Sequence, residues 1–192
     1  MKKLIVMVGM VASTFSIYGQ KIVGVYTSEV SYSQNKYNLE INVNNITKIH
    51  VNELFNSNYL VISTQDSSYQ IAKDSVFAFV KNNGVKYRLF KGEEYEIINS
   101  NQPITLYKKI HRVLNHNKGV TYQTRYFFSL ANSTEISPLT LTDLKSKCAG
   151  QYDNFISYVE LYFRHDGELF EYDHTHKKHK INHLFDIHAK NK

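Results

Sequence analysis

Hydrophobic and polar residues alternate along much of the first two thirds of the chain. In residues 37–43, with the sequence YNLEINV, each odd position is apolar or aromatic and each even position is polar. Successive side chains of a β-strand point to opposite faces, so this pattern predicts a strand with one buried face. Similar segments predict strands at residues 21–27, 46–51, 59–64, 68–72, 76–81, 85–90, 94–98, 104–113 and 120–129.

Polar turns separate these predicted strands. Residues 82–84 read Asn-Asn-Gly, and an Asn-Gly pair readily adopts the positive φ angles of a tight hairpin. Residues 115–119 predict a second, longer hairpin loop, and residues 44–45 are expected to turn the chain between two further strands. Because no long helical pattern interrupts the strands, the order predicts an antiparallel meander that closes into a barrel or a sandwich.

The periodicity changes after Pro138. Thr140 is a candidate N-cap for a short helix that ends near Gly150, and Asp153 is a candidate N-cap for a second helix that runs to about Arg164. A third helix is expected from Glu168 onward. The fold class predicted is therefore α+β, a predominantly antiparallel sheet followed by two or three C-terminal helices. The apolar face of the second helix is expected to contain Phe155, Ile156, Val159, Tyr162 and Phe163.

The N-terminus has the pattern of a secretory signal peptide. Lys2 and Lys3 precede an apolar run at residues 4–17, and the small residue Gly19 fits a cleavage point. The run is shorter than the roughly 20 residues of a membrane-spanning helix. We therefore expect residues 1–19 to be removed and residues 20–192 to form one domain, exported to the periplasm or secreted. Within it we expect a β-rich part at 20–136 and a helical part at 137–192.

Charge and cysteine content indicate which partners and which covalent links to expect. The 23 Lys and Arg residues exceed the 17 Asp and Glu residues and are spread along the chain. We take this charge as favouring solubility and acidic partners, and in an exported protein we expect no nucleic acid partner. The single cysteine, Cys148, excludes an internal disulfide. It shares a predicted helix face with Leu141 and Leu144, so a buried and inert thiol is expected.

The last segment of the chain is rich in histidine. Imidazole and carboxylate are the usual protein ligands of zinc and neighbouring divalent metals. On a helix, residues at the spacing of His176, His179 and His183 point in similar directions, which would let them share one ion. The alternative is an exposed basic face, because lysines 177, 178 and 180 would repel a dication. The candidate metal ligands are Asp173, His176, His179 and His183.

Aromatic residues are the second candidate feature. The chain has 15 Tyr and 11 Phe but no Trp. Tyr87, Tyr122 and Tyr126 are candidates to hold a small apolar or saccharide ligand inside a barrel, and the alternative is ordinary cross-strand packing.

The sequence shows no pattern typical of a catalytic site. It has no G-x-S-x-G motif, no H-E-x-x-H motif and no glycine-rich phosphate loop. We therefore expect a soluble, non-catalytic binding or accessory protein of the cell envelope, with an unidentified envelope or extracellular partner. No cofactor is expected. Two alternative functions remain: binding of a divalent metal at the histidine cluster, and binding of a small apolar or saccharide ligand inside the barrel.

The last third of the chain resembles a family of exported proteins from Bacteroidetes-type bacteria, to which no activity is assigned. The resemblance rests on residues 138–145 (PLTLTDLK) and on the spacing Y-D-x-x-H-K-x-x-K-I-N from Tyr172 to Asn182. It implies a location in the envelope or outside a Gram-negative cell. Of the histidine cluster, only His176 belongs to this pattern. The motif is therefore equally compatible with a hydrogen-bonded corner in which Asp173 caps a turn and Tyr172 packs against the sheet.

Overall fold

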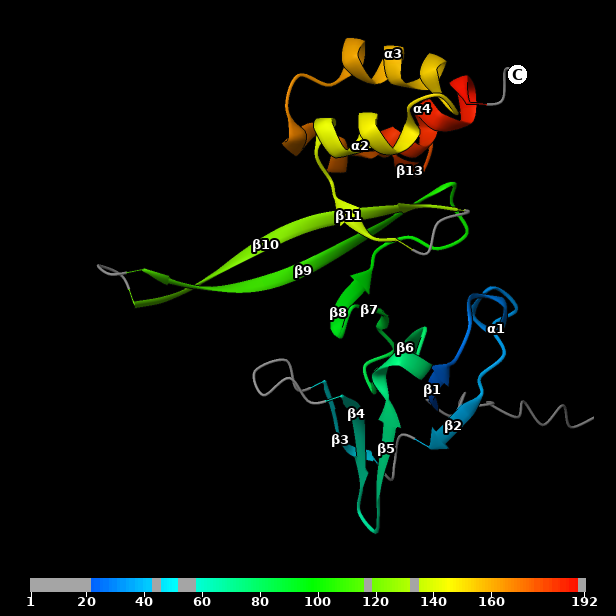
Figure 1. Cartoon of the computed structure of the whole chain (residues 1–192), viewed down its shortest axis with the longest axis vertical. Coiled ribbons are helices and arrows are strands. Elements are labelled where there is room, and N and C mark those ends of the chain that lie inside the picture. Colours follow the sequence, from blue (N-terminus) through cyan, green and yellow to red (C-terminus); the bar gives the residue numbers. More distant parts are fainter. Residues whose placement is uncertain (1–21, 43–45, 52–57, 116–118, 132–134, 190–192) are drawn as a thin grey trace, which may run out of the picture.

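The strands of the main sheet form one open antiparallel array (Figure 1). This computed structural model describes residues 22–42, 46–51, 58–115, 119–131 and 135–189. The predicted signal peptide and the predicted turn at residues 44–45 lie outside these ranges. The order of the eight strands is β11-β10-β9-β8-β7-β6-β1-β2. Their bounds are β1 Ile22–Tyr26, β2 Leu39–Asn42, β6 Ala78–Val80, β7 Lys86–Phe90, β8 Glu93–Ile97, β9 Ile104–Asn115, β10 Gly119–Leu130 and β11 Ser137–Pro138.

The observed sheet confirms the predicted α+β class but not a closed barrel. Among the described strands, β11 and β2 are the two edges and do not pair with each other. The Asn-Asn-Gly hairpin is confirmed, because β6 and β7 pair antiparallel and Gly84 has a φ of +81°. The longer hairpin is also confirmed, since β9 and β10 pair continuously from the Asn115–Gly119 pair to the Ile104–Leu130 pair.

A smaller sheet packs against one end of the main sheet. It contains β3 Ile46–Val51, β4 Tyr59–Thr64 and β5 Ser68–Ala72, followed by the short 3₁₀ helix η2 at Lys73–Ser75. Leu60 and Ile62 of β4 are fully buried with Val25, Phe79 and Leu89 of the main sheet. The chain therefore forms a sheet-on-sheet core at this end.

Three helices cover the opposite end of the main sheet (Figure 1). They are α2 Leu141–Cys148, α3 Asp153–Tyr162 and α4 Lys180–His188. Between α3 and α4 lie the 3₁₀ helix η3 Asp166–Phe170 and a small hairpin of β12 Tyr172–Asp173 and β13 Lys178–His179. The buried residues of this core include Ile104, Leu106, Phe128, Leu144, Phe155, Leu169 and Ile181.

Several details of the helical prediction are confirmed. The Thr140 side chain accepts a hydrogen bond from the Asp143 amide at 3.0 Å, as expected of an N-cap. Gly150 has a φ of +77° just after α2. Cys148 is fully buried, and this burial raises the pKa of its thiol to about 11.

Other details of the helical prediction are wrong. Asp153 is the first residue of α3 rather than its N-cap, and it accepts a hydrogen bond from the Gly150 amide instead. Tyr162 is exposed, although its helix position suggested the apolar face. The third helix begins at Lys180 rather than at Glu168, because the segment between them forms η3 and the β12–β13 hairpin. A short helix, α1 Glu29–Ser33, was not expected at all.

A buried asparagine joins α4 to the main sheet. Asn182 has no exposed surface, and its side-chain oxygen accepts a hydrogen bond from the Ile104 amide at 3.0 Å. Its side-chain nitrogen donates to the Ile104 carbonyl at 3.0 Å. Asn99 donates to the same carbonyl and accepts from the Leu106 amide. Buried backbone groups need such partners, so Asn182 fixes the position of α4 over the start of β9, while Asn99 joins the connection between β8 and β9 to β9 itself.

Candidate functional site

The β12–β13 hairpin is closed by the carboxylate of Asp173. Its Oδ1 accepts hydrogen bonds from the Thr175 amide at 2.8 Å and the His176 amide at 3.1 Å. Lys177, next in the turn, has a φ of +53°. The hydrogen-bonded corner with which the motif is compatible is therefore present at Asp173, but the expected packing of Tyr172 against the sheet is not. Tyr172 is half exposed and its ring contacts His174 and His179.

The second oxygen of Asp173 orients a histidine. Asp173 Oδ2 lies 2.7 Å from His176 Nδ1. This contact, followed by the backbone hydrogen bonds of the turn, lowers the pKa of Asp173 to about 2. The carboxyl group is consequently ionised throughout the neutral pH range, which is the form that binds a cation.

Helix α4 brings a second histidine to the same place. The His183 ring stacks on the His176 ring, with centroids 3.7 Å apart and planes inclined by 18°. One ligand atom each from Asp173, His176 and His183 lies within 4.8 Å of the other two. Two imidazoles and one carboxylate suit zinc and its neighbours, and three protein ligands leave a fourth position for water or an external ligand. We call these three residues the Asp/His trio.

The fourth predicted ligand, His179, does not join the trio. It is buried just before α4, and its Nδ1 lies 2.9 Å from the Phe170 carbonyl oxygen. The predicted helical face shared by His176, His179 and His183 is wrong, because α4 begins only at Lys180. His183 reaches His176 through the fold of the hairpin against α4 rather than through helical spacing.

Ion pairs neutralise two of the three lysines that the sequence placed near the cluster. Lys178 Nζ lies 2.7 Å from Asp186 Oδ2. Lys180 pairs with Glu171 across the start of α4. The repulsion expected from these lysines is therefore offset locally, which leaves Lys177 in the exposed turn.

A pocket adjoins the trio. Asp173 and His183 line it, and its volume is about 460 Å³. Phe163, Leu184 and Ile187 form its apolar wall. The trio is thus reached from a partly apolar cleft rather than only from the turn.

The three candidate tyrosines are not gathered around a common cavity. Strand register places Tyr87 and Tyr126 in one cross-strand row, with the ion-paired Glu96 and Lys108 between them. The Tyr87 ring stacks on Phe79, and burial raises the pKa of its hydroxyl to about 12. Tyr126 stacks on Phe170 with ring centroids 3.7 Å apart. Tyr122 is largely exposed on β10.

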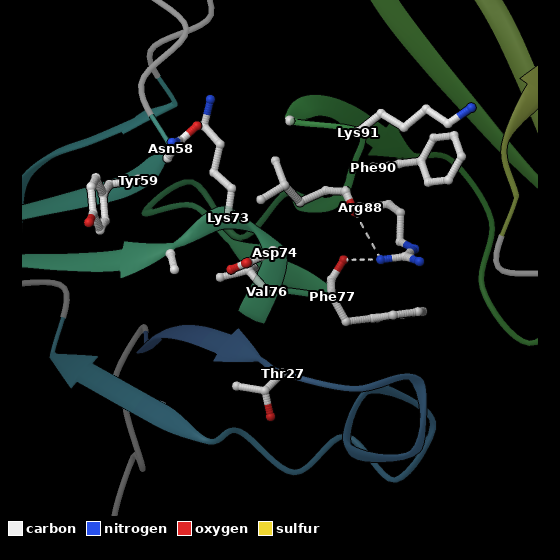
Figure 2. A pocket seen from close by; sticks show the side chains of 13 residues that line it. Thr27, Asn58, Tyr59, Lys73, Asp74, Val76, Phe77, Arg88, Phe90 and Lys91 are labelled. Carbon is white, nitrogen blue, oxygen red and sulfur yellow. Dashed lines mark hydrogen bonds between the residues drawn. The ribbon is translucent and has the colours of Figure 1, made fainter.

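A larger pocket, which the sequence did not suggest, lies where the smaller sheet meets β6 and β7 (Figure 2). Its volume is about 810 Å³. Figure 2 shows the Arg88 side chain lying along Phe77 at one side of it, with the guanidinium carbon 3.4 Å from the ring centroid. Arg88 Nη1 donates to the Phe77 and Leu89 carbonyl oxygens, and burial lowers the pKa of this guanidinium. Arg88 therefore ties the start of β6 to β7.

Comparison with known proteins adds no assignment. No family model, curated protein or solved structure matches this chain. None of the helices in the described ranges is long and apolar enough to cross a membrane.

Proposed function

We propose that this protein is an exported, non-catalytic binding protein that holds a divalent cation, zinc foremost, on the Asp/His trio. The observation that carries the proposal is the convergence of three ligand atoms within 4.8 Å from a hairpin turn and a helix. The ligand types match those of zinc sites, in which His nitrogen and carboxylate oxygen bind at about 2 Å.

The surroundings of the trio support binding of the cation. Asp173 is held by two backbone amides, so its second oxygen has a fixed direction. His183 lies on α4, which the buried Asn182 joins to the main sheet. Ligands that are positioned before the metal arrives lose less conformational freedom on binding. The adjoining pocket gives a fourth ligand, such as water or a small anion, access to the metal.

Zinc titration of the full chain, purified without a histidine tag and dialysed against a mild chelator, tests the metal site. We expect one zinc ion per chain, and a Co²⁺ derivative with the visible absorption of four-coordinate cobalt. His183→Ala and His176→Ala should each weaken zinc binding at least tenfold while circular dichroism remains unchanged.

His174→Ala is the matched control, because His174 is exposed in the same turn but outside the trio. It should bind zinc as the unchanged chain does. Failure to retain stoichiometric zinc, or equal losses for His174→Ala and His183→Ala, would contradict the proposed site.

Export has its own test. The positively charged start and the apolar run at residues 4–17 support it. We expect the protein in the periplasm or the medium of its native host, with an N-terminus at Gln20. A cytosolic protein that retains residues 1–19 would refute this part of the proposal without affecting the zinc site.

A further inference from the structure

The far half of the β9–β10 hairpin has no neighbouring strand in the described part of the chain. We call it the arm; it comprises residues 109–115 of β9 and 119–125 of β10, which pair only with each other. Strand β8 pairs with β9 at Tyr107 and Lys108, and β11 pairs with β10 at Phe127 and Phe128. Figure 1 shows the hairpin extending well beyond the helical layer. A two-stranded ribbon of this kind is only marginally stable in water by itself. Apolar residues exposed on it therefore suggest a surface that binds another component.

One face of the arm is apolar and exposed. Register places Leu114 opposite Val120 at the far end, Tyr122 opposite Arg112, and Ile110 opposite Thr124. The exposed fractions are 77% for Leu114, 73% for Tyr122, 59% for Ile110 and 40% for Val120. An exposed apolar cluster of this kind indicates an interaction surface.

The arm is also basic. The sequence has no Asp or Glu between Glu96 and Glu135, whereas it has five Lys and Arg residues in that interval. At the base of the arm, Lys108 pairs with Glu96 and Lys109 pairs with Glu93. Farther out, Arg112 and Arg125 form no ion pair with any residue that the structure describes. The positive charge is therefore least compensated where the apolar side chains are most exposed.

We propose that the arm docks on the surface of a bilayer that contains anionic phospholipid. The acidic headgroups of such a surface can pair with the arginines. The hydrocarbon just beneath the headgroups can receive the apolar side chains at the end of the arm. Leu114 and Val120 would enter most deeply, and Tyr122 would lie at headgroup level, where tyrosine is enriched. A second copy of the chain fits less well, because two arms without acidic residues repel each other.

The absence of tryptophan from the chain provides a specific probe. In the full chain, Tyr122→Trp introduces the only tryptophan, and its selectively excited fluorescence reports on the arm and not on residues 1–19. With vesicles of equal parts phosphatidylglycerol and phosphatidylcholine, we expect a blue-shifted emission that brominated lipid quenches. Leu161→Trp, at an exposed leucine of α3, is the matched control and should show neither effect.

Charge and apolar variants measure the two contributions separately. Each arginine near an anionic surface contributes about fivefold in binding, so Arg112→Gln/Arg125→Gln should weaken binding about thirtyfold. Lys36→Gln/Lys91→Gln removes the same charge from exposed positions outside the arm and should have little effect. Leu114→Ser should weaken binding about tenfold. Circular dichroism verifies that each variant is folded.

Four results would overturn this proposal. They are an unchanged Tyr122→Trp emission with vesicles, equal binding to vesicles of phosphatidylcholine alone, a larger response from Leu161→Trp, and a concentration-dependent blue shift without lipid. A concentration-dependent blue shift without lipid would indicate that the arm mediates self-association. An unchanged emission with vesicles, together with binding to an acidic protein, would indicate that the arm binds that protein. None of these outcomes bears on the zinc site, which uses other residues.

Discussion

The two halves of the β9–β10 hairpin have the same alternation but different surroundings. In the near half, Ile104, Leu106 and Phe128 are fully buried beneath the helices. In the far half, Ile110 and Tyr122 occupy the same face of the same strands and are exposed. A period of two predicts a strand and its apolar face; it does not predict what covers that face. Here the cover ends because the helical layer ends.

The boundary between the halves is a single cross-strand row. Tyr126 of this row stacks on Phe170 of η3, and its partner Lys108 pairs with Glu96 of β8. On the face that carries Ile104, Leu106 and Phe128, the residues before the row pack against the helices, and beyond the row Ile110, Tyr122 and Leu114 are exposed. On the opposite face, Lys109 still reaches Glu93 of β8. We therefore infer that the near half contributes most to global stability and that the exposed far half contributes little.

The largest expected effect is at the buried half. Phe128→Ala should lower the free energy of unfolding by about 3–5 kcal/mol, because it leaves a cavity in the helix-covered core. Tyr122→Ala, on the same face of the same strand, should change it by less than about 0.5 kcal/mol. Urea unfolding followed by circular dichroism measures both. Similar losses for the two variants would show that the arm is packed in solution.

A smaller effect is expected where α4 is joined to the sheet. Asn182→Ala removes two buried hydrogen bonds to Ile104, so it should lower the free energy of unfolding by about 3 kcal/mol. Asn154→Ala removes one exposed contact with the His188 carbonyl and should cost less than about 0.5 kcal/mol. Thermal unfolding of the two variants measures this difference. If Asn182→Ala were as stable as Asn154→Ala, Asn182 would not hold α4 on the sheet.

Thiol labelling should show a difference in reaction rate between a buried and an exposed thiol, with little change in stability. Cys148 should react slowly with dithiobis(nitrobenzoate), because it is buried and its pKa is raised to about 11. The thiolate gains population only as the pH approaches this value, so the rate should stay low from about pH 7 to about pH 9. Leu114→Cys adds an exposed thiol on the arm and should add one fast-reacting equivalent. Fast reaction of Cys148 in the unchanged chain would contradict the packing of α2.

Much of the sheet could be predicted from the sequence. The strands and the two hairpins followed from alternation and from Asn-Gly turn chemistry, which are local signals. Helix α1 was missed because five residues give no helical periodicity; its signal was the pair Ser28 and Ser31, whose side chains and backbone amides form a reciprocal cap. Whether the meander closes depends on contacts between distant strands, which alternation does not encode.

The candidate site was predicted in part. Asp173, His176 and His183 do converge, but through a hairpin turn rather than a continuous helix. His179 fails because its ring bonds to a carbonyl inside the fold, a contact that residue spacing cannot reveal. Asn182 was overlooked as a structural residue. An Asn beside buried Ile181 within an otherwise amphipathic helix was the available signal, since a buried amide needs partners.

Hydrogen exchange measured by mass spectrometry on the full chain tests most directly whether the zinc site and the arm are separate binding regions. Zinc should slow exchange in residues 172–183 and leave the arm unchanged, whereas anionic vesicles should slow exchange in the arm and leave residues 172–183 unchanged. If zinc or vesicles slowed exchange in both regions, the account would be contradicted. It would also be contradicted if zinc did not protect residues 172–183 and vesicles did not protect the arm.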